Sequence, residues 1–336
     1  MQANQAALPA NGGTRADRAS RAGNTRRGND MRRNNNALRY RIKRFIPMYI
    51  MLLGAFAYYL LFHYLPIYGI QIAFRDYRLI DGITGSPWAG FKYFRQALFE
   101  TPMFWGAFRN TIIISSLKFL VNFPAPIILA LMMNEIKNMA FKKVTQTISY
   151  LPHFISWVVL AGLFRNILSP SSGFVNMVIR AFGGEPVFFV GSNDWFRTVL
   201  VFTSTFKGIG WGTIIYLAAL SNVNTELYEA AAIDGAGRLR QTWMVTLPAI
   251  SNIIVLQFIL SIRSIIGDDF QQIFNMYSPV VYQTGDVIAT YNYRLGLESM
   301  RYSFSSAVGL FMNVIGLVLV VATNWVVKNF SEYGLW

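Results

Sequence analysis

The chain has 336 residues, of which 54% are hydrophobic and 14% are charged, and its formal net charge is +14. Soluble globular domains carry about 25% charged residues, so this composition excludes most soluble enzymes and indicates an integral membrane protein. The sequence contains no cysteine, which excludes disulfides, Cys-ligated metals and cysteine nucleophiles. Two histidines leave little for a metal site.

Residues 1–44 form a basic segment with few large apolar side chains. They hold 11 of the 30 Lys and Arg residues and only two acids, Asp17 and Asp30. Such a segment cannot bury enough surface to offset the entropy of ordering, so we expect a disordered cytoplasmic tail. Its arginines would also suit an RNA-binding arm. Anchoring near anionic lipid is the simpler interpretation, and we expect no nucleic-acid ligand.

Six segments are predicted to cross a membrane as helices. Four stretches lack Lys, Arg, Asp and Glu over at least the roughly 20 residues that a spanning helix needs, and two more contain a single lysine each. No ten-residue segments alternate as in a membrane barrel, so the predicted fold is an all-α integral membrane domain over residues 45–336. The spans are expected at about 45–68, 110–134, 144–165, 198–220, 246–267 and 304–327.

The basic residues that flank these spans predict the orientation of the chain. Lys and Arg are retained on the cytoplasmic side during insertion. With the basic tail inside, the lysine-containing loop at 134–146 and the arginine-containing loop at 221–245 are also inside. The other three loops, which hold most of the acids, then face out. We therefore expect both termini in the cytoplasm.

The loop between the fourth and fifth spans is predicted to form two short helices. Asn224 or Thr225 can cap the first helix, which contains three consecutive alanines, a strong helix former. Gly235 and Gly237 permit the positive φ of a sharp turn. Pro248 suits the first turn of the next spanning helix. A slim helix that projects from a membrane is shaped to enter a groove on a partner, and the alternative is a loop that lies on the lipid surface.

The spacing of residues in this loop resembles a known family motif. Glu229, Ala230 and Ala231, three further residues, Gly235, and then Leu247-Pro248 match the EAA loop of permease subunits in binding-protein-dependent ABC importers. In that family the loop forms a coupling helix in a cleft of the cytoplasmic ATPase. The resemblance implies a coupling role for Glu229, Ala230, Ala231, Asp234, Gly235, Ala236 and Pro248.

Other segments are similar to the oligosaccharide branch of this family, in particular to permeases of aldouronate- and alginate-type importers. They are residues 68–77, 85–88, 149–157, 285–287 and 333–336. The resemblance covers roughly residues 45–336 and implies a six-helix transmembrane domain in the bacterial inner membrane. It also implies import of an oligosaccharide, with an acidic, uronate-containing one favoured.

The sequence has no Gly-x-x-x-x-Gly-Lys-Ser/Thr motif, so another chain must hydrolyse ATP. We find no catalytic constellation and expect neither enzymatic activity nor a bound cofactor. The resemblance implies several partners: a second permease subunit, usually a different chain, two copies of an ABC ATPase that uses ATP and Mg²⁺, and an extracytoplasmic sugar-binding protein.

Polar residues inside spans are costly and usually face a partner helix or a water-filled path. Charge-assisted hydrogen bonds from cations would suit an acidic sugar, although such cations also snorkel to headgroups or pair with acids. On one face of the fifth span, the pathway candidates are Gln257, Ser261, Ser264 and Asp268. The candidates elsewhere are Asn122, Lys118, Lys207 and Arg263.

A secondary transporter or channel driven by an ion gradient is the alternative. It would need an acid or ion site at mid-membrane, ideally in related repeats with broken helices. The sequence shows no clear internal repeat and no Asp or Glu deep in a span.

Overall fold

The computed structural model describes residue 42 and residues 45–262 and 270–330, in two units, Met1–Gly69 and Ile70–Trp336. Almost all of the basic tail predicted for residues 1–44 therefore lies outside the described residues. The described part of unit 1 belongs to the helical stretch Phe45–Phe74, which is long and apolar enough to cross a membrane. This stretch passes through a π-helix, η1 (Leu60–Tyr64), next to Pro66, whose ring nitrogen cannot donate a helical hydrogen bond.

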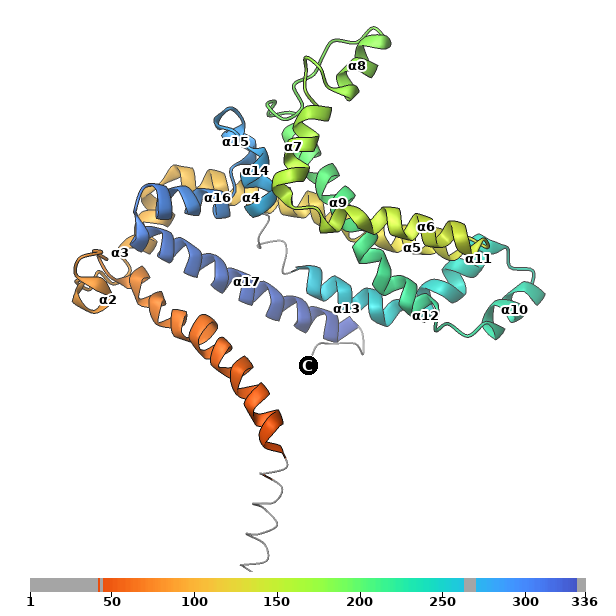
Figure 1. Ribbon diagram of the computed structural model, residues 1–336, viewed down its shortest axis with the longest axis horizontal. Coiled ribbons are helices and arrows are strands. Elements are labelled where there is room, and N and C mark those ends of the chain that lie inside the picture. Colours follow the sequence, from red (N-terminus) through yellow and green to blue (C-terminus); the bar gives the residue numbers. More distant parts are fainter. Residues whose placement is uncertain (1–41, 43–44, 263–269, 331–336) are drawn as a thin grey trace, which may run out of the picture. The chain divides into compact units, whose positions relative to one another are not determined.

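Unit 2 is built from helices joined by loops (Figure 1). Its first described elements are η2 (Leu65–Phe74), which begins in unit 1, α2 (Gly82–Gly85), α3 (Lys92–Arg95), η3 (Gln96–Glu100), α4 (Pro102–Asn122), α5 (Pro124–Asn134), α6 (Met139–Tyr150), η4 (Leu151–Phe154), α7 (Trp157–Ile167), α8 (Phe174–Ala181) and α9 (Phe196–Leu220). The remaining elements are α10 (Glu226–Ile233), α11 (Arg238–Gln241), η5 (Thr242–Thr246), α12 (Leu247–Ala249), α13 (Ser251–Ile262), α14 (Phe270–Met276), η7 (Pro279–Val281), α15 (Tyr282–Gly285), α16 (Ile288–Tyr293), η8 (Arg294–Glu298) and α17 (Tyr302–Phe330).

The six predicted spans correspond to four long helices and two bent pairs. Besides the first helix, Pro102–Asn134, Phe196–Leu220 and Tyr302–Val326 are each long and apolar enough to cross a membrane. The predicted spans at 144–165 and 246–267 are not straight helices. The first is the pair α6–η4 and α7, bent by 105°, and the second is the pair α11–α12 and α13, bent by 67°. The second predicted span also begins earlier, at Pro102 instead of residue 110.

The 105° bend has a local cause and a stabilising contact. Ile155 and Ser156 adopt extended backbone between η4 and α7, and the Ser156 hydroxyl caps α7. The carbonyl oxygens left unpaired at the end of η4 need donors. The ammonium group of Lys207 in α9 supplies them, because it donates to the carbonyls of His153, at 2.8 Å, and of Ile155. Lys207 therefore stabilises the bend from within the neighbouring span.

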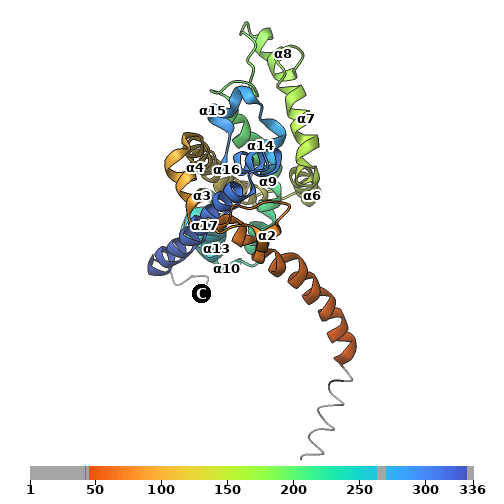
Figure 2. The same ribbon diagram turned by 90° about the vertical axis from the view of Figure 1, so that its left-hand side faces the viewer.

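Helix α9 is the central helix of unit 2 and contacts α4, α5, α6 and α13. One apolar core joins α4, α7, α9 and α14, and a second joins the start of α4 to α16 and α17. A third, smaller core lies between α5, the end of α9 and Ile250, where α12 breaks from α13. In both views α8 projects from the far end of α7 (Figure 2).

Gly210 marks the closest approach of α9 to α6. A Cβ atom at this position would lie 2.1 Å from the Ser149 carbonyl oxygen, so Gly210→Ala must push two backbones apart. Overpacking of this kind costs about 1–3 kcal/mol. We expect Gly210→Ala to lower the thermal unfolding temperature of the detergent-solubilised chain. Gly208→Ala in the same helix is the matched control and should leave this temperature unchanged or raise it, because no atom of the described residues lies within 4 Å of its Cβ position. Equal shifts for both variants would contradict this account.

Candidate coupling loop and transport cavity

The loop between α9 and α13 contains the predicted helix followed by a sharp turn. The Asn224 side chain accepts a hydrogen bond from the Glu226 backbone N–H at 3.0 Å and so caps α10. Gly235 has a φ of 75°, the left-handed conformation that glycine adopts without strain. Gly237 does not use the freedom that glycine permits, because its φ is −67° and its ψ is 167°. A single left-handed residue is enough to reverse the chain here.

Two contacts hold the parts of this loop together, and a third fastens the loop to the end of α5. The Tyr228 and Thr246 hydroxyls lie 3.1 Å apart and join α10 to η5. The Gln241 side chain donates to the Ala236 carbonyl at 3.0 Å. Arg238 forms an ion pair with Glu135, which follows α5. The loop is therefore held to the end of α5 as well as to the two helices that it connects.

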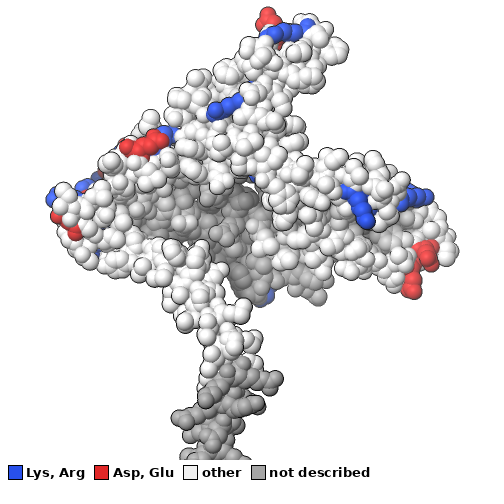
Figure 3. All heavy atoms as spheres, in the orientation of Figure 1, with Lys and Arg blue, Asp and Glu red and all other residues white. Residues whose placement is uncertain are grey.

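The outward surface of the loop combines acidic and apolar side chains. Glu229, Ala230, Asp234, Gly235 and Pro248 are exposed, whereas Ala231 and Ala236 are half-buried. Large apolar side chains are exposed beside them: Ile233 at 87%, Leu239 at 80% and Trp243 at 71%. Figure 3 shows charged groups at the end of unit 2 that carries α10 and α11, with broad uncharged surface between it and the other charged regions. An apolar surface rimmed by charge is typical of a protein-binding site.

A cavity of about 240 Å³ lies between α4, α5, α9 and α13. Polar side chains from separate spans line this cavity. Placing polar side chains inside membrane-spanning helices costs free energy. Four of the predicted pathway candidates line it, namely Lys118, Asn122, Gln257 and Ser261. The aromatic side chains of Phe119, Phe123 and Tyr216 complete much of the wall. The cavity therefore offers both polar groups and ring faces.

Lys118 is the buried cation of this cavity, with an exposed fraction of 4%. Its ammonium group donates to the side-chain oxygen of Gln272 in α14. The Gln272 amide in turn donates to the Leu200 carbonyl and to the Thr203 hydroxyl, both at 2.7 Å. The sequence interpretation missed Gln272, because it lies beyond the predicted fifth span and its neighbours carry no motif.

Asn122 joins α4 to α9 at the wall of the same cavity. Its amide nitrogen donates to the Ser204 hydroxyl at 2.8 Å, and its amide oxygen accepts from the Thr205 hydroxyl. The remaining predicted candidates lie elsewhere. Lys207 is at the 105° bend and is not among the residues that line the cavity. Arg263, Ser264 and Asp268 lie outside the described residues.

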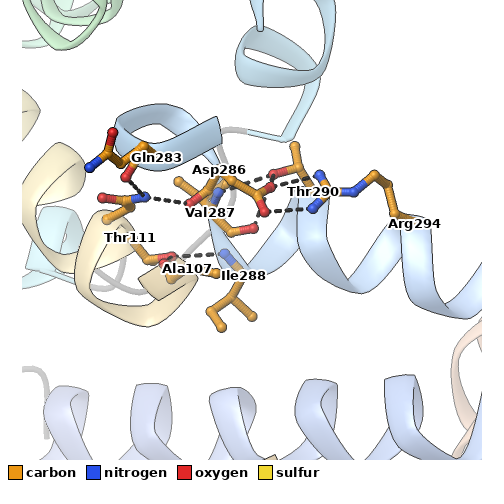
Figure 4. A network of polar contacts seen from close by, with 9 residues as sticks. Ala107, Thr111, Gln283, Asp286, Val287, Ile288, Thr290 and Arg294 are labelled. Carbon is orange, nitrogen blue, oxygen red and sulfur yellow. Dashed lines mark hydrogen bonds and ion pairs between the residues drawn. The ribbon is translucent and has the colours of Figure 1, made fainter. Parts of the chain in front are cut away.

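At the opposite end of α9 from the coupling loop, a buried ion pair fixes the chain between α15 and η8 (Figure 4). Arg294 donates to both carboxylate oxygens of Asp286, at 2.8 and 2.6 Å, and its guanidinium lies 4.3 Å from the Tyr282 ring centre. These hydrogen bonds raise the pKa of Arg294. The Thr290 hydroxyl also donates to Asp286, and the Asp286 carbonyl accepts from Asn110 in α4. In the sequence, residues 285–287 carry only the family resemblance.

An apolar helical domain with a polar cavity between its spans and a helix-bearing loop at one end defines a membrane transport protein. Residues 122–332 match the family described as "Binding-protein-dependent transport system inner membrane component", and the chain belongs to that family. It is therefore a multi-pass inner-membrane permease of an ABC importer, and it is not an enzyme.

Two proteins of Bacillus subtilis (strain 168) are similar over most of their length. Protein LplB is 41% identical over 294 residues, which cover 88% of this chain and 92% of LplB. The polygalacturonan/rhamnogalacturonan transport system permease protein YteP is 42% identical over 289 residues, 86% of this chain and 90% of YteP.

Two solved structures share the fold with a TM-score of 0.80 and 39% sequence identity, each over 88% of this chain. One is a bacterial ABC transporter involved in the import of the acidic polysaccharide alginate, with 99% of the matched chain covered. The other is a bacterial alginate ABC transporter in complex with an alginate pentasaccharide-bound periplasmic protein, with 98% covered.

Proposed function

We propose that the chain is one of two membrane subunits of an ATP-driven importer that moves an acidic oligosaccharide into the cytoplasm. The observation that carries this proposal is the cavity of about 240 Å³, which places the Lys118 ammonium beside amide, hydroxyl and aromatic groups. Sugars offer hydroxyls for hydrogen bonds and apolar ring faces for contact with aromatic side chains. A carboxylate on the sugar would gain charge-assisted hydrogen bonds from the cation.

The similar proteins support this choice of substrate class. The matched solved transporter is involved in the import of the acidic polysaccharide alginate, and YteP is named for polygalacturonan and rhamnogalacturonan. The match to a transporter in complex with a pentasaccharide-bound periplasmic protein supports delivery by a soluble binding protein. A second permease subunit, which we expect to be a different chain, would complete the pore.

In the proposed mechanism, two cytoplasmic ATPase subunits bind ATP and Mg²⁺, and their closure moves α10. The exposed positions Glu229, Ala230 and Gly235 would enter a cleft on one ATPase subunit, with Asp234 and Pro248 beside them. The contacts of Tyr228 and Arg238 would pass this movement to the spans. The binding protein would dock at the other end, outside the cell, with both termini of this chain in the cytoplasm.

The test is to reconstitute the chain with its partners in lipid vesicles and to measure ATP hydrolysis with different oligosaccharides. Uronate oligomers should stimulate hydrolysis, and the same oligomers with their carboxyl groups reduced to alcohols should do so at least tenfold less effectively. Equal stimulation by both would contradict the acidic substrate, and no stimulation by any oligosaccharide would contradict sugar import.

A further inference from the structure

A second hollow lies beside the contact between α4 and α9, and it shares no lining residue with the transport cavity. It has a volume of about 380 Å³, and its walls are formed mainly by apolar side chains. The residues are Leu117 and Val121 of α4 with Arg197, Thr198, Val201, Phe202 and Thr205 of α9. Phe202 is 59% exposed and Val121 is 42% exposed, so the groove opens on the outside of unit 2.

The groove has a cation at one end and apolar walls along the rest. We place the inner edge of the hydrocarbon core at Leu220, where α9 ends. At 1.5 Å per residue, a core of about 30 Å then takes about 20 residues of α9 and ends near Leu200. Arg197 lies three residues further, at the depth of the lipid headgroups. Val201, Phe202 and Thr205 lie within the core. The groove therefore begins in the headgroup layer and continues into the acyl-chain region.

Two hydrogen bonds orient the guanidinium group of Arg197, and its other N–H groups can donate to a ligand. Its Nε donates to the Thr284 carbonyl at 3.1 Å, and one terminal nitrogen donates to the Asn110 side chain at 2.8 Å. A guanidinium has five N–H groups, and the others form no hydrogen bond with a described residue. Arg109 in α4 is exposed and directly precedes Asn110, the residue that accepts a hydrogen bond from Arg197.

Arg197 and Arg109, the residue before its partner Asn110, both bring positive charge to this end of the groove, and positive charge favours a bound anion. Within the described part of the chain, neither Arg109 nor Arg197 forms an ion pair with a carboxylate. A ligand that contacts both the arginines and the apolar walls of the groove must combine an anionic head with a flexible apolar chain. Phosphate pairs well with arginine, and a membrane supplies phosphates attached to acyl chains.

We propose that this groove binds an anionic phospholipid from the leaflet opposite the coupling loop, with its phosphate against Arg197 and Arg109 and one acyl chain along Val121, Val201 and Phe202. Bound in this way, the lipid stabilises the packing of α4 against α9, which forms the wall of the transport cavity on the other side of the contact. The site is independent of the sugar that the transporter carries.

The experiment uses the assembled transporter in nanodiscs that contain equal amounts of phosphatidylglycerol and phosphatidylcholine. After extraction into detergent, the lipids that remain bound are counted by native mass spectrometry. We expect retained phosphatidylglycerol to exceed phosphatidylcholine, and Arg109→Gln to lower this ratio about fivefold, because a Lys or Arg near a membrane surface contributes about 1 kcal/mol toward anionic lipid. Arg165→Gln, at an exposed arginine of α7, is the matched control and should leave the ratio unchanged.

A photoreactive phosphatidylglycerol with a diazirine in its acyl chain locates the site in the same nanodiscs. Peptides that contain Val121, Val201 or Phe202 should carry the label. Retention of both lipids in equal amounts would overturn the proposal, and so would a groove that stays unlabelled because a partner subunit covers it. Equal losses in Arg109→Gln and Arg165→Gln would also overturn it, since any surface arginine would then suffice.

Discussion

Replacing Glu229 with glutamine is expected to lower oligosaccharide-stimulated ATP hydrolysis by the assembled transporter about 10- to 100-fold. The Glu229 side chain is exposed on α10, next to the exposed apolar side chain of Ile233. A carboxylate in this position can accept charge-assisted hydrogen bonds from an ATPase subunit, which are worth about 1.5–3 kcal/mol each. The substitution keeps the size and helix propensity of the side chain and removes only the charge. The rate of hydrolysis with saturating substrate and binding protein measures the effect.

Glu226 provides the matched control in the same helix. It lies in the first turn of α10, and its carboxylate accepts a hydrogen bond from the Asn224 side chain at 3.1 Å, a contact that glutamine can also make. Glu226→Gln should therefore retain near wild-type coupling. If both variants hydrolyse ATP at the wild-type rate while remaining assembled, the assignment of α10 as the coupling helix is wrong. If the rate of ATP hydrolysis falls equally in both variants, coupling depends on the total charge of the loop and not on Glu229 in particular.

The local geometry of the coupling loop could largely be predicted from the sequence. A capping Asn224, three alanines and Gly235 each have a strong local preference, and the structure agrees with all of them. Gly237 shows the limit of that reasoning, since glycine permits a positive φ without requiring one. The side chains that fasten the loop, Tyr228 and Arg238, depend on tertiary contacts and carry no local signal.

The approximate places of the apolar segments were predictable, but their bends were not. The structure has four helices long and apolar enough to cross a membrane within its described residues, or six spans if each bent pair counts as one. Hydropathy reports how long an apolar segment is and not its direction, so the 105° and 67° bends within predicted spans are invisible to it. Pro152 and Pro248 were available signals, although prolines in membrane helices are often accommodated. Helical periodicity did bring Gln257 and Ser261 to one cavity with Lys118 and Asn122. Lys207 does not line this cavity. It donates instead to backbone carbonyl groups that the 105° bend leaves without a helical partner.

Lys118→Gln is expected to reduce uptake of an acidic oligosaccharide about 10- to 100-fold in kcat/KM while sparing a neutral one. Lys118 is buried and lines the cavity, so its charge is little screened by solvent. Loss of one charge-assisted hydrogen bond to a carboxylate corresponds to about 1.5–3 kcal/mol. Glutamine is chosen because its amide can still donate to the side-chain oxygen of Gln272, which would otherwise be left unpaired in the interior. Uptake of labelled oligomers into proteoliposomes measures the effect.

The carboxyl-reduced oligomer separates a role in recognition from a role in folding. If Lys118 meets the substrate carboxylate, Lys118→Gln changes the preference between the acidic and the reduced oligomer, and Lys118→Arg, which keeps the charge, restores part of it. If Lys118 only holds α4 to α14 through Gln272, both substrates lose uptake equally in Lys118→Gln. Unchanged uptake of the acidic oligomer would show that Lys118, the one cation among the described residues that line the cavity, does not select the substrate by its charge.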